Sequence, residues 1–289
     1  MAGQLDDKAH WPLGKPTVYG NNYDPSLLQP IQRSESRQAL GFTTNDTLPF
    51  HGTDIWNAYE LSWLETSGKP AVGRLVLEIP AAVPQTVESK SLKLYLGSFS
   101  QTAYASSEQV MAAIERDLTA LLGGCVNASL VPLEPNEDAQ TSPLQKPYLN
   151  AGGSPVLLDE LDVTCEHYHP NPELLRCDAT RVVNKGTLYT HLFRSLCPVT
   201  GQPDWASVMV RYSGREIAAA SLLQYLVSFR LHQGFHESCV ERLFMEIKQQ
   251  CAPTELSVYA RFARRGGIDI NPFRSDFEAY PDNLKMGAQ

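Results

Sequence analysis

Residues 91–100 read Ser-Leu-Lys-Leu-Tyr-Leu-Gly-Ser-Phe-Ser, and residues 221–230 read Ser-Leu-Leu-Gln-Tyr-Leu-Val-Ser-Phe-Arg. The two segments are identical at six of ten positions and lie 130 residues apart. In both, Leu, Tyr, Leu and Phe recur at i, i+3, i+4 and i+7, a spacing that places side chains on one face of an α-helix. The chain therefore carries an internal duplication, and each copy contains an amphipathic helix at this point.

The residues around the two segments extend the duplication and predict its fold class. Apolar periodicity predicts a second helix in each copy, and alternating apolar residues predict strands around the helices. The second helices are expected at about 106–122 and 236–250, and the clearest strands at 59–63, 74–79 and 256–262. Short links between successive strands favour antiparallel pairing. We therefore expect an α+β fold of two modules, each an antiparallel sheet with two helices on one face.

Three regions follow from this organisation. Residues 1–50 are rich in Pro, Asn, Gln and Ser and predict an irregular N-terminal arm or extension that covers another part of the molecule. The first module is expected over 51–165 and the second over 166–289. The polar stretch 135–155 is expected to be a loop. Because helices cover only one face of each sheet, further copies would close the other face, and we expect a homodimer.

Composition excludes several classes of protein. The 289 residues include 24 Lys and Arg and 32 Asp and Glu, a net charge of −8, which argues against direct binding of nucleic acid through phosphates. No segment approaches the roughly 20 apolar residues that span a membrane, and the polar N-terminus has no secretory pattern. Six cysteines are too few for a disulfide framework in a chain of this length. We expect a cytoplasmic protein that does not contact a membrane.

Polar residues that occur in only one copy are the first candidates for chemistry. Glu88-Ser89-Lys90 precedes the first repeated helix, whereas residues 218–220 of the other copy are all Ala. A helix start with Ser89 or Ser91 as its cap attracts anions, and the nearby lysines would suit a phosphate. The alternative is an ordinary helix cap followed by solvated lysines.

Phe235-His236-Glu237 opens the last predicted helix, and the other copy has Ala-Ser-Ser at 105–107. An aromatic face, an imidazole and a carboxylate could stack on a flat heterocycle and accept hydrogen bonds from its N–H groups. The alternative is a glutamate that complements the helix dipole, with the histidine on the surface. Chemistry would then be divided between the two halves, unless both differences are surface drift.

The segment Leu196-Cys197-Pro198-Val199-Thr200-Gly201-Gln202-Pro203-Asp204 predicts a rigid loop between strands. It presents a thiol and, seven residues later, a carboxylic acid, which are a candidate nucleophile and a candidate proton donor. A free thiol has a pKa of about 8.5, so the site must favour the thiolate, and His236 or a cationic neighbour could do so. The alternative is a cysteine that serves only as a small buried apolar residue.

Two other segments carry candidate ligand-binding residues. Cys165, His167, His169 and Cys177 are the residue types that bind zinc, although their spacing is not a standard finger pattern. Arg264-Arg265-Gly266-Gly267 is a short basic turn that could receive a phosphate or could simply be exposed. Neither a dinucleotide-binding Gly-x-Gly-x-x-Gly motif nor a P-loop occurs.

Three motifs together resemble the NADPH-dependent 7-cyano-7-deazaguanine (preQ0) reductases of the QueF family, in their long two-module form. They are Glu-Ser-Lys-Ser-Leu-Lys-Leu-Tyr at 88–95, Cys-Pro-x-Thr-Gly-Gln-Pro-Asp at 197–204, and Phe-His-Glu at 235–237. Their order and spacing match over nearly the whole chain after about residue 20. The resemblance implies tandem tunnelling-fold (T-fold) modules that bind flat, purine-like ligands where modules meet.

The resemblance also implies a reaction, namely four-electron reduction of the nitrile of 7-cyano-7-deazaguanine to 7-aminomethyl-7-deazaguanine by two NADPH, in the biosynthesis of the tRNA modification queuosine. Cys197 would form a covalent thioimide with the nitrile carbon, and Asp204 would protonate the nitrogen. No metal ion is implied. The implied substrate contacts are Val87, Glu88, Ser89, Phe235, His236 and Glu237, and the implied NADPH contacts are Ser89, Lys90, Arg265 and Gly266.

Two alternatives stay open at this point. One is a metal-dependent cyclohydrolase of the same fold that uses Cys165, His167 and His169. The other is a non-catalytic module that binds a pterin or a purine.

Overall fold

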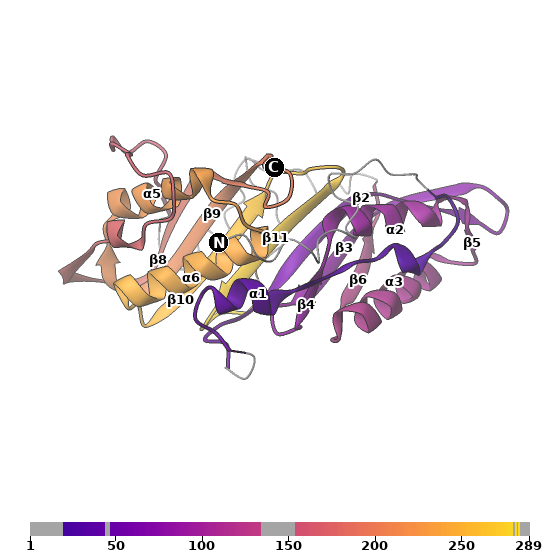
Figure 1. Cartoon of the computed structure of the whole chain (residues 1–289), viewed down its shortest axis with the longest axis horizontal. Coiled ribbons are helices and arrows are strands. Elements are labelled where there is room, and N and C mark those ends of the chain that lie inside the picture. The colour runs from indigo at the N-terminus through magenta and orange to yellow at the C-terminus, as the bar shows by residue number, and fades with distance from the viewer. Residues whose placement is uncertain (1–19, 44–46, 134–153, 280, 282, 284–289) are drawn as a thin grey trace, which may run out of the picture.

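The computed structural model describes residues 20–43, 47–133, 154–279, 281 and 283 (Figure 1). Most of the loop expected at 135–155 lies outside these residues. The first half contains β2 (His51–Glu65), β3 (Pro70–Pro80), β4 (Gln85–Val87), α2 (Ser89–Ser98), β5 (Ala103–Tyr104), α3 (Ser107–Leu122) and β6 (Asn127–Val131). The second half contains β7 (Val156–Leu157), β8 (Cys177–Leu196), β9 (Pro203–Ile217), α5 (Ala219–Val227), α6 (His236–Cys251), β10 (Glu255–Phe262) and β11 (Ile268–Ser275).

The strands of both halves form one continuous sheet in the order β6-β3-β2-β11-β10-β9-β8-β7 (Figure 1). Its strands pair antiparallel except for two short parallel pairs, β5 with β2 and β7 with β8. The halves join where β11 pairs with β2, from Ile268 opposite Ala58 to Ser275 opposite His51. The expected α+β class with antiparallel sheets is confirmed, and the two modules share a sheet within one chain.

A glycine makes the contact between the halves possible. Gly52 on β2 has a φ of +148°, and a Cβ atom added there would lie 2.0 Å from the carbonyl oxygen of Phe273 on β11. Any other side chain at this position would therefore push the two strands apart.

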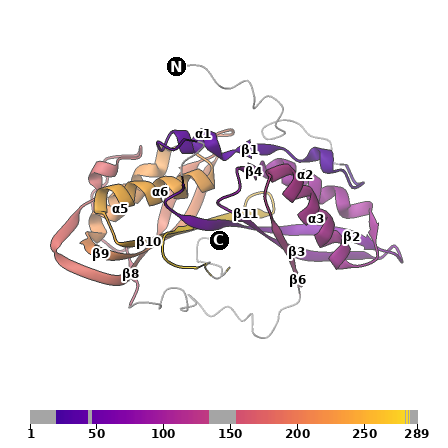
Figure 2. The same ribbon diagram turned by 90° about the horizontal axis from the view of Figure 1, so that it is seen from below.

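Both copies of the repeated segment form helices that pack on the same face of the sheet (Figure 2). In each copy the repeated tyrosine donates a hydrogen bond to a carboxylate on the second helix. The Tyr95 hydroxyl donates to Asp117 on α3 at 2.7 Å, and the Tyr225 hydroxyl donates to Glu246 on α6 at 2.5 Å. The repeated apolar residues are buried in two separate cores, one for each half. The predicted helices and the duplication are confirmed.

The described part of the N-terminal arm is less irregular than expected. The arm contains β1 (Pro30–Gln32) and α1 (Arg33–Gln38). β1 pairs antiparallel with β4, and α1 lies beside α6, so the arm bridges the helix layers of both halves (Figure 2). Apolar periodicity in the sequence did not predict these elements, because they are short and α1 packs mainly through ion pairs.

Five buried charged residues attach the arm, and we call them the buried ion cluster. Arg33 of α1 lies 2.5 Å from Asp54 of β2, and Arg37 lies 2.8 Å from Glu241 of α6. Arg274 of β11 contacts both acids at 2.8 Å. Burial alone would raise the pKa of each acid, but the guanidinium groups outweigh it and hold the pKa of Asp54 and of Glu241 below their usual values.

The second half begins earlier than expected. β7 hydrogen-bonds to β8, and Leu158 is buried in the core of the second half. The expected boundary after residue 165 therefore lies too far along the chain. It was missed because a two-residue strand leaves no periodic signal.

Every helix in the described part of the chain is too short or too polar to be a membrane span.

Replacing Glu241 with Gln should destabilise the protein by about 3–5 kcal/mol, because Arg37 and Arg274 would stay buried with one carboxylate fewer. Urea unfolding measures the change. The matched control is Glu65→Gln, which breaks the exposed pair with Lys69 and should change stability by at most ~1 kcal/mol. Equal effects of the two substitutions would contradict a structural role for the cluster.

At acid pH, the difference in unfolding free energy between the wild type and Glu241→Gln should disappear. The folded-state pKa of Glu241 is depressed, so its contribution is fully present above the unfolded-state pKa of about 4.3 and is lost as the pH falls through the folded value.

Candidate active site

The segments that differ between the two copies meet where the halves join. Because β11 pairs with β2, the start of α2, the start of α6 and the loop after β8 surround one small cavity of about 30 Å³. Trp56 and Ile270 from the two joined strands form part of its wall. The predicted site residues that line it are Val87, Ser89, Cys197, Asp204, Phe235, His236, Glu237 and Arg265.

Cys197 lies in a tight turn just after β8, as the sequence predicts. Its amide donates to the Gln202 carbonyl at 2.9 Å, and its own carbonyl accepts from the Gly201 amide at 3.0 Å. Gly201 has a φ of +68°, which favours glycine. The cysteine is only 2% exposed. The loop therefore holds a buried thiol in one place at the cavity.

Burial alone would raise the pKa of the Cys197 thiol. Hydrogen bonds from the hydroxyl and amide of Thr200, the amide of Val199 and the guanidinium of Arg265 outweigh burial, and the pKa lies below its usual value. The expected cationic neighbour is thus Arg265. Sequence reasoning missed Thr200, although a hydroxyl residue three positions after a cysteine in a Pro–Gly turn is a usable signal.

Asp204, near the start of β9, contacts two basic side chains. Arg265 Nη1 lies 2.9 Å from Asp204 Oδ1, and His236 Nε2 lies 3.5 Å from Asp204 Oδ2. The His236 ring stacks on Phe262, with centroids 3.8 Å apart and planes at 17°. Its Nδ1 is buried and has no hydrogen-bond partner among the described residues. An unsatisfied buried nitrogen at a cavity wall is suited to a bound ligand.

Glu237 is also buried, and the His236 side chain is 12% exposed, so the alternative that places this histidine on the surface is wrong. Glu237 lies in the first turn of α6, and its Oε1 accepts a hydrogen bond from the Thr86 hydroxyl at 3.1 Å. Burial and then the charge of Asp54 raise its pKa, while Arg33 and His236 oppose them. A carboxylate beside a cavity can accept hydrogen bonds from a ligand.

The expectation that Ser89 or Ser91 caps α2 is wrong. The Glu88 carboxylate is the cap, because its two oxygens accept from the amides of Lys90 at 2.8 Å and Ser91 at 2.7 Å. Glu88 is buried and does not line the cavity. Burial raises its pKa against these hydrogen bonds. An anion at this helix start would find two amides already occupied.

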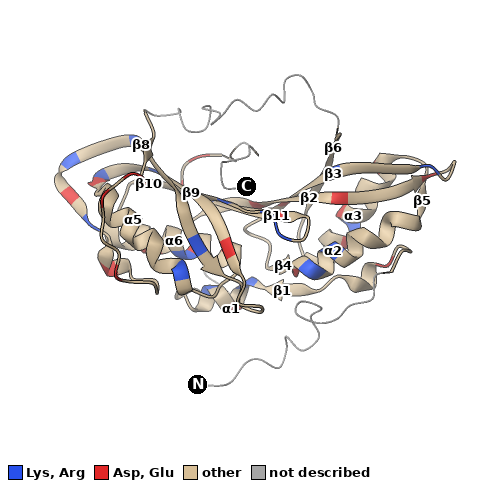
Figure 3. Cartoon of the chain, turned by 90° about the horizontal axis from the view of Figure 1, so that it is seen from above, with Lys and Arg blue, Asp and Glu red and all other residues tan. Residues whose placement is uncertain are grey.

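Basic residues from both halves meet beside the cavity. Lys93 of α2 donates to the Gly266 carbonyl at 2.8 Å, and the Arg264 guanidinium lies 4.6 Å from the centre of the Tyr59 ring on β2. Figure 3 shows basic positions, in blue, on α2 and on the turn that precedes β11. Lys90 lies in the first turn of α2. The expected basic turn thus faces the Ser-Lys-Ser helix of the other half.

The alternative zinc site is not assembled. Among the residues that the structure describes, which include 165–177, no three His, Cys, Asp or Glu side chains lie close enough to hold a metal ion. Cys177 instead starts β8 and contacts the Cys251 carbonyl at 4.0 Å. Residues 165–169 are not a strand, so alternate side chains do not share a face as that hypothesis required.

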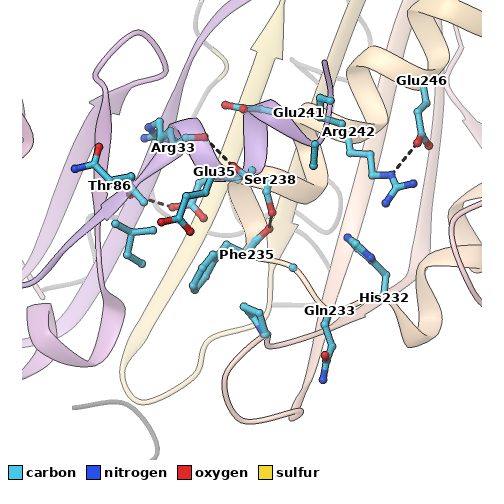
Figure 4. Close-up of a pocket in the computed structure, with 18 residues that line it drawn as sticks. Arg33, Glu35, Thr86, His232, Gln233, Phe235, Ser238, Glu241, Arg242 and Glu246 are labelled. Atoms are coloured by element: carbon cyan, nitrogen blue, oxygen red, sulfur yellow. Dashed lines mark hydrogen bonds and ion pairs between the residues drawn. The ribbon is translucent and has the colours of Figure 1, made fainter. Parts of the chain in front are cut away.

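A larger pocket of about 360 Å³ adjoins the cavity between α1 and α6. Figure 4 shows Arg33 and Thr86 on one side of it and Phe235 and Ser238 on the other. The residues that line both spaces are Ile31, Thr86, Pro198, Gly234, Phe235 and Glu237. The volume of the larger pocket suits a small organic molecule, because pockets for such ligands are about 300–1,000 Å³.

Comparison with known proteins identifies the family. A family model described as nitrile reductase, 7-cyano-7-deazaguanine-reductase N-term, matches residues 19–130, and a model described as QueF-like protein matches residues 203–280. A solved structure described as the archaeosine synthase QueF-Like in the apo form is 22% identical and covers 32% of this chain and 94% of its own, with a TM-score of 0.30.

Curated relatives match over almost the whole length. Proteins of Cupriavidus taiwanensis and Burkholderia lata are each 48% identical, and one of Ralstonia nicotianae is 50% identical. Each match covers 97% of this chain and 98% of the relative, and each relative is named NADPH-dependent 7-cyano-7-deazaguanine reductase. The chain belongs to this family of NADPH-dependent 7-cyano-7-deazaguanine reductases.

Proposed function

We propose that the protein reduces the nitrile of 7-cyano-7-deazaguanine to the aminomethyl group of 7-aminomethyl-7-deazaguanine, and that Cys197 forms a covalent thioimide on the way. The names of the relatives carry the nitrile reduction and its dependence on NADPH. The observation that supports the covalent route is the buried Cys197 thiol, whose pKa is lowered, in the same cavity as Asp204. The product would serve the biosynthesis of the tRNA base queuosine.

The first step joins sulfur to carbon without any change of oxidation state. The Cys197 thiolate attacks the nitrile carbon, one π bond of the nitrile breaks, and its electron pair goes to nitrogen. Asp204 then protonates that nitrogen. Because Asp204 lines the same cavity as Cys197, the aspartate can receive the proton of the thiol and pass it on. The net result is addition of the thiol across the nitrile.

The cavity and the larger pocket that adjoins it would together hold the flat base. Glu237 accepts hydrogen bonds from N–H groups on its edge, and the free Nδ1 of His236 gains a partner. Phe235 supplies an aromatic face. From the first half, Val87 and Ser89 contribute to the wall, and Glu88 fixes their position by capping α2.

The residues beside the cavity fit NADPH. Lys93 on α2 contacts the turn that carries Arg264 and Arg265 through the Gly266 carbonyl. An added Cβ at Gly266 would meet only the end of Lys93, so a ligand can approach the backbone closely there. We assign contacts to Ser89, Lys90, Arg265 and Gly266. Side chains rather than helix amides would hold a phosphate, since Glu88 occupies two of those amides. When bound, NADPH supplies hydride, and a nitrile needs two hydrides to become a primary amine.

We also propose that the enzyme works in the cytoplasm as a homodimer and does not bind nucleic acid directly. All six cysteines are free thiols, which suits a reducing compartment, and the net charge of −8 disfavours phosphate backbones. The molecular mass in solution tests the dimer.

Cys197→Ala should abolish the near-ultraviolet absorbance of a thioimide on mixing with the cyano base, and also NADPH oxidation, because the nucleophile is gone. Absorbance spectra with and without NADPH measure both. The control is Cys125→Ala, which removes an exposed thiol and should change neither. Survival of either signal in Cys197→Ala would refute the covalent route.

Asp204→Asn should slow thioimide formation by about 10²–10⁴-fold, the usual effect of losing a general acid. Stopped-flow absorbance at the thioimide band gives the rate. The asparagine keeps the shape of the side chain but carries no acidic proton. A rate close to that of the wild type would assign the proton to His236 or to water.

Lys90→Ala should raise KM for NADPH by about 10- to 100-fold, the equivalent of one charged hydrogen bond. Thioimide formation precedes hydride transfer and should proceed at the normal rate. Lys69→Ala, at an exposed lysine of the β2–β3 turn, is the control that should leave KM unchanged. An unchanged KM in Lys90→Ala would remove this residue from the cofactor site.

A further inference from the structure

The charge of Glu237 is balanced at a distance. None of the ion pairs among the described residues includes Glu237, and its side-chain donor is the neutral hydroxyl of Thr86. The buried ion cluster next to it contains three guanidinium groups and two carboxylates. The cluster alone therefore has one unbalanced positive charge, and an ionised Glu237 is the third carboxylate that balances it.

Every element packed around Glu237 contributes to this balance. Burial favours the neutral acid most, and the nearby charge of Asp54 acts in the same direction, whereas Arg33 is the strongest charge in favour of the carboxylate. The charged and polar groups that act on it are Arg33 of α1, Asp54 of β2, Thr86 of β4 and His236 of α6, and Glu241 of α6 lines the same larger pocket.

The protonation state of Glu237 decides which hydrogen-bonding groups it can bind. An ionised carboxylate only accepts hydrogen bonds, whereas the neutral acid carries an O–H donor. The edge of a guanine-like base offers N–H donors, so a neutral Glu237 would set a donor against a donor. The neutral acid keeps one carbonyl acceptor, but only the carboxylate can accept from two N–H groups at once, so the ionised form binds this edge more tightly.

We propose that Arg33 of the N-terminal arm is a positioning residue for substrate recognition, which keeps Glu237 ionised while the Thr86 hydroxyl sets the direction of its carboxylate. This inference rests on the proposed function, in which Glu237 binds the base. The arm is built for such a role, because β1 pairs Ile31 with Thr86 and α1 begins two residues later. Arg33, Thr86 and Glu237 all line the larger pocket, where Figure 4 labels Arg33 and Thr86.

The test measures the affinity of 7-cyano-7-deazaguanine by calorimetry between about pH 6 and about pH 9. A Cys197→Ala background restricts the measurement to non-covalent binding. Arg33→Gln should weaken binding about tenfold near neutral pH, and the loss should shrink as the pH rises, because higher pH ionises Glu237 without help from the arginine. A loss that is the same at every pH would overturn the role of Arg33.

Arg37→Gln is the matched control. Arg37 lies on the same helix and in the same cluster, but it contacts Glu241 and lines neither of the two spaces that Glu237 lines. It should lower the midpoint of urea unfolding much as Arg33→Gln does, yet leave the pH dependence of binding unchanged. If both variants shift that dependence alike, the effect is loosening of the arm and the inference fails.

A second substitution separates charge from folding. Asp54→Asn removes the negative charge that opposes ionisation of Glu237, so adding it to Arg33→Gln should restore binding near neutral pH. A damaged arm would not be repaired in this way, and absence of rescue would contradict the inference. Thr86→Val should weaken binding about tenfold at all pH values, whereas Thr86→Ser, which keeps the hydroxyl, should not.

Glu237→Gln separates the role of Glu237 in binding the base from the role of Arg33 in keeping Glu237 ionised. If it binds the base as tightly as the background protein, Glu237 does not anchor the substrate, and the proposed function fails at that residue. If it weakens binding while Arg33→Gln keeps the normal pH dependence, the role of Arg33 alone is overturned.

Discussion

The antiparallel pairing of β11 with β2 is the constraint on which the rest of this protein depends. It turns two duplicated sheets into one and requires Gly52, because any side chain there would strike the Phe273 carbonyl. Asp54 on one strand and Arg274 on the other then meet, and charges from α1 and α6 complete the buried ion cluster above the junction. The cavity lies at the same junction, so the pairing of β11 with β2 supports both the buried ion cluster and the candidate site.

The duplication shows how a repeated module can divide its tasks. Leu92, Tyr95, Leu96 and Phe99 of one core recur as Leu222, Tyr225, Leu226 and Phe229 of the other, and each repeated tyrosine donates a hydrogen bond to a carboxylate on the next helix. The polar residues at the helix starts differ, with Glu88-Ser89-Lys90 in one copy and Phe235-His236-Glu237 in the other. Each set occurs once because the joined sheet brings one helix start from each half to a single cavity.

Electrostatics at the site act through groups that are buried but not isolated. Cys197 is shielded from water, which opposes a thiolate, yet donors from its own turn and from Arg265 reverse that effect. Glu237 is shielded too, and its nearest donor is neutral, so its pKa stays raised. The difference lies in the number of direct donors. Cys197 accepts from the hydroxyl and amide of Thr200, the amide of Val199 and the guanidinium of Arg265, whereas the side-chain donor to Glu237 is the Thr86 hydroxyl.

The sequence alone determined the elements whose signals are local, namely the four repeated helices, the strands beside them and the rigid Cys197 loop, because periodicity and turn residues act over a few positions. Its three motifs also indicated which side chains to bring together. Only the tertiary structure decided that Glu88 rather than a serine caps α2, that Thr200 contacts the thiol, that the arm is ordered by buried arginines, and that the Cys165–Cys177 segment assembles no metal site. These outcomes depend on distances between residues far apart in the chain, and such distances leave no periodic trace in the order of the amino acids.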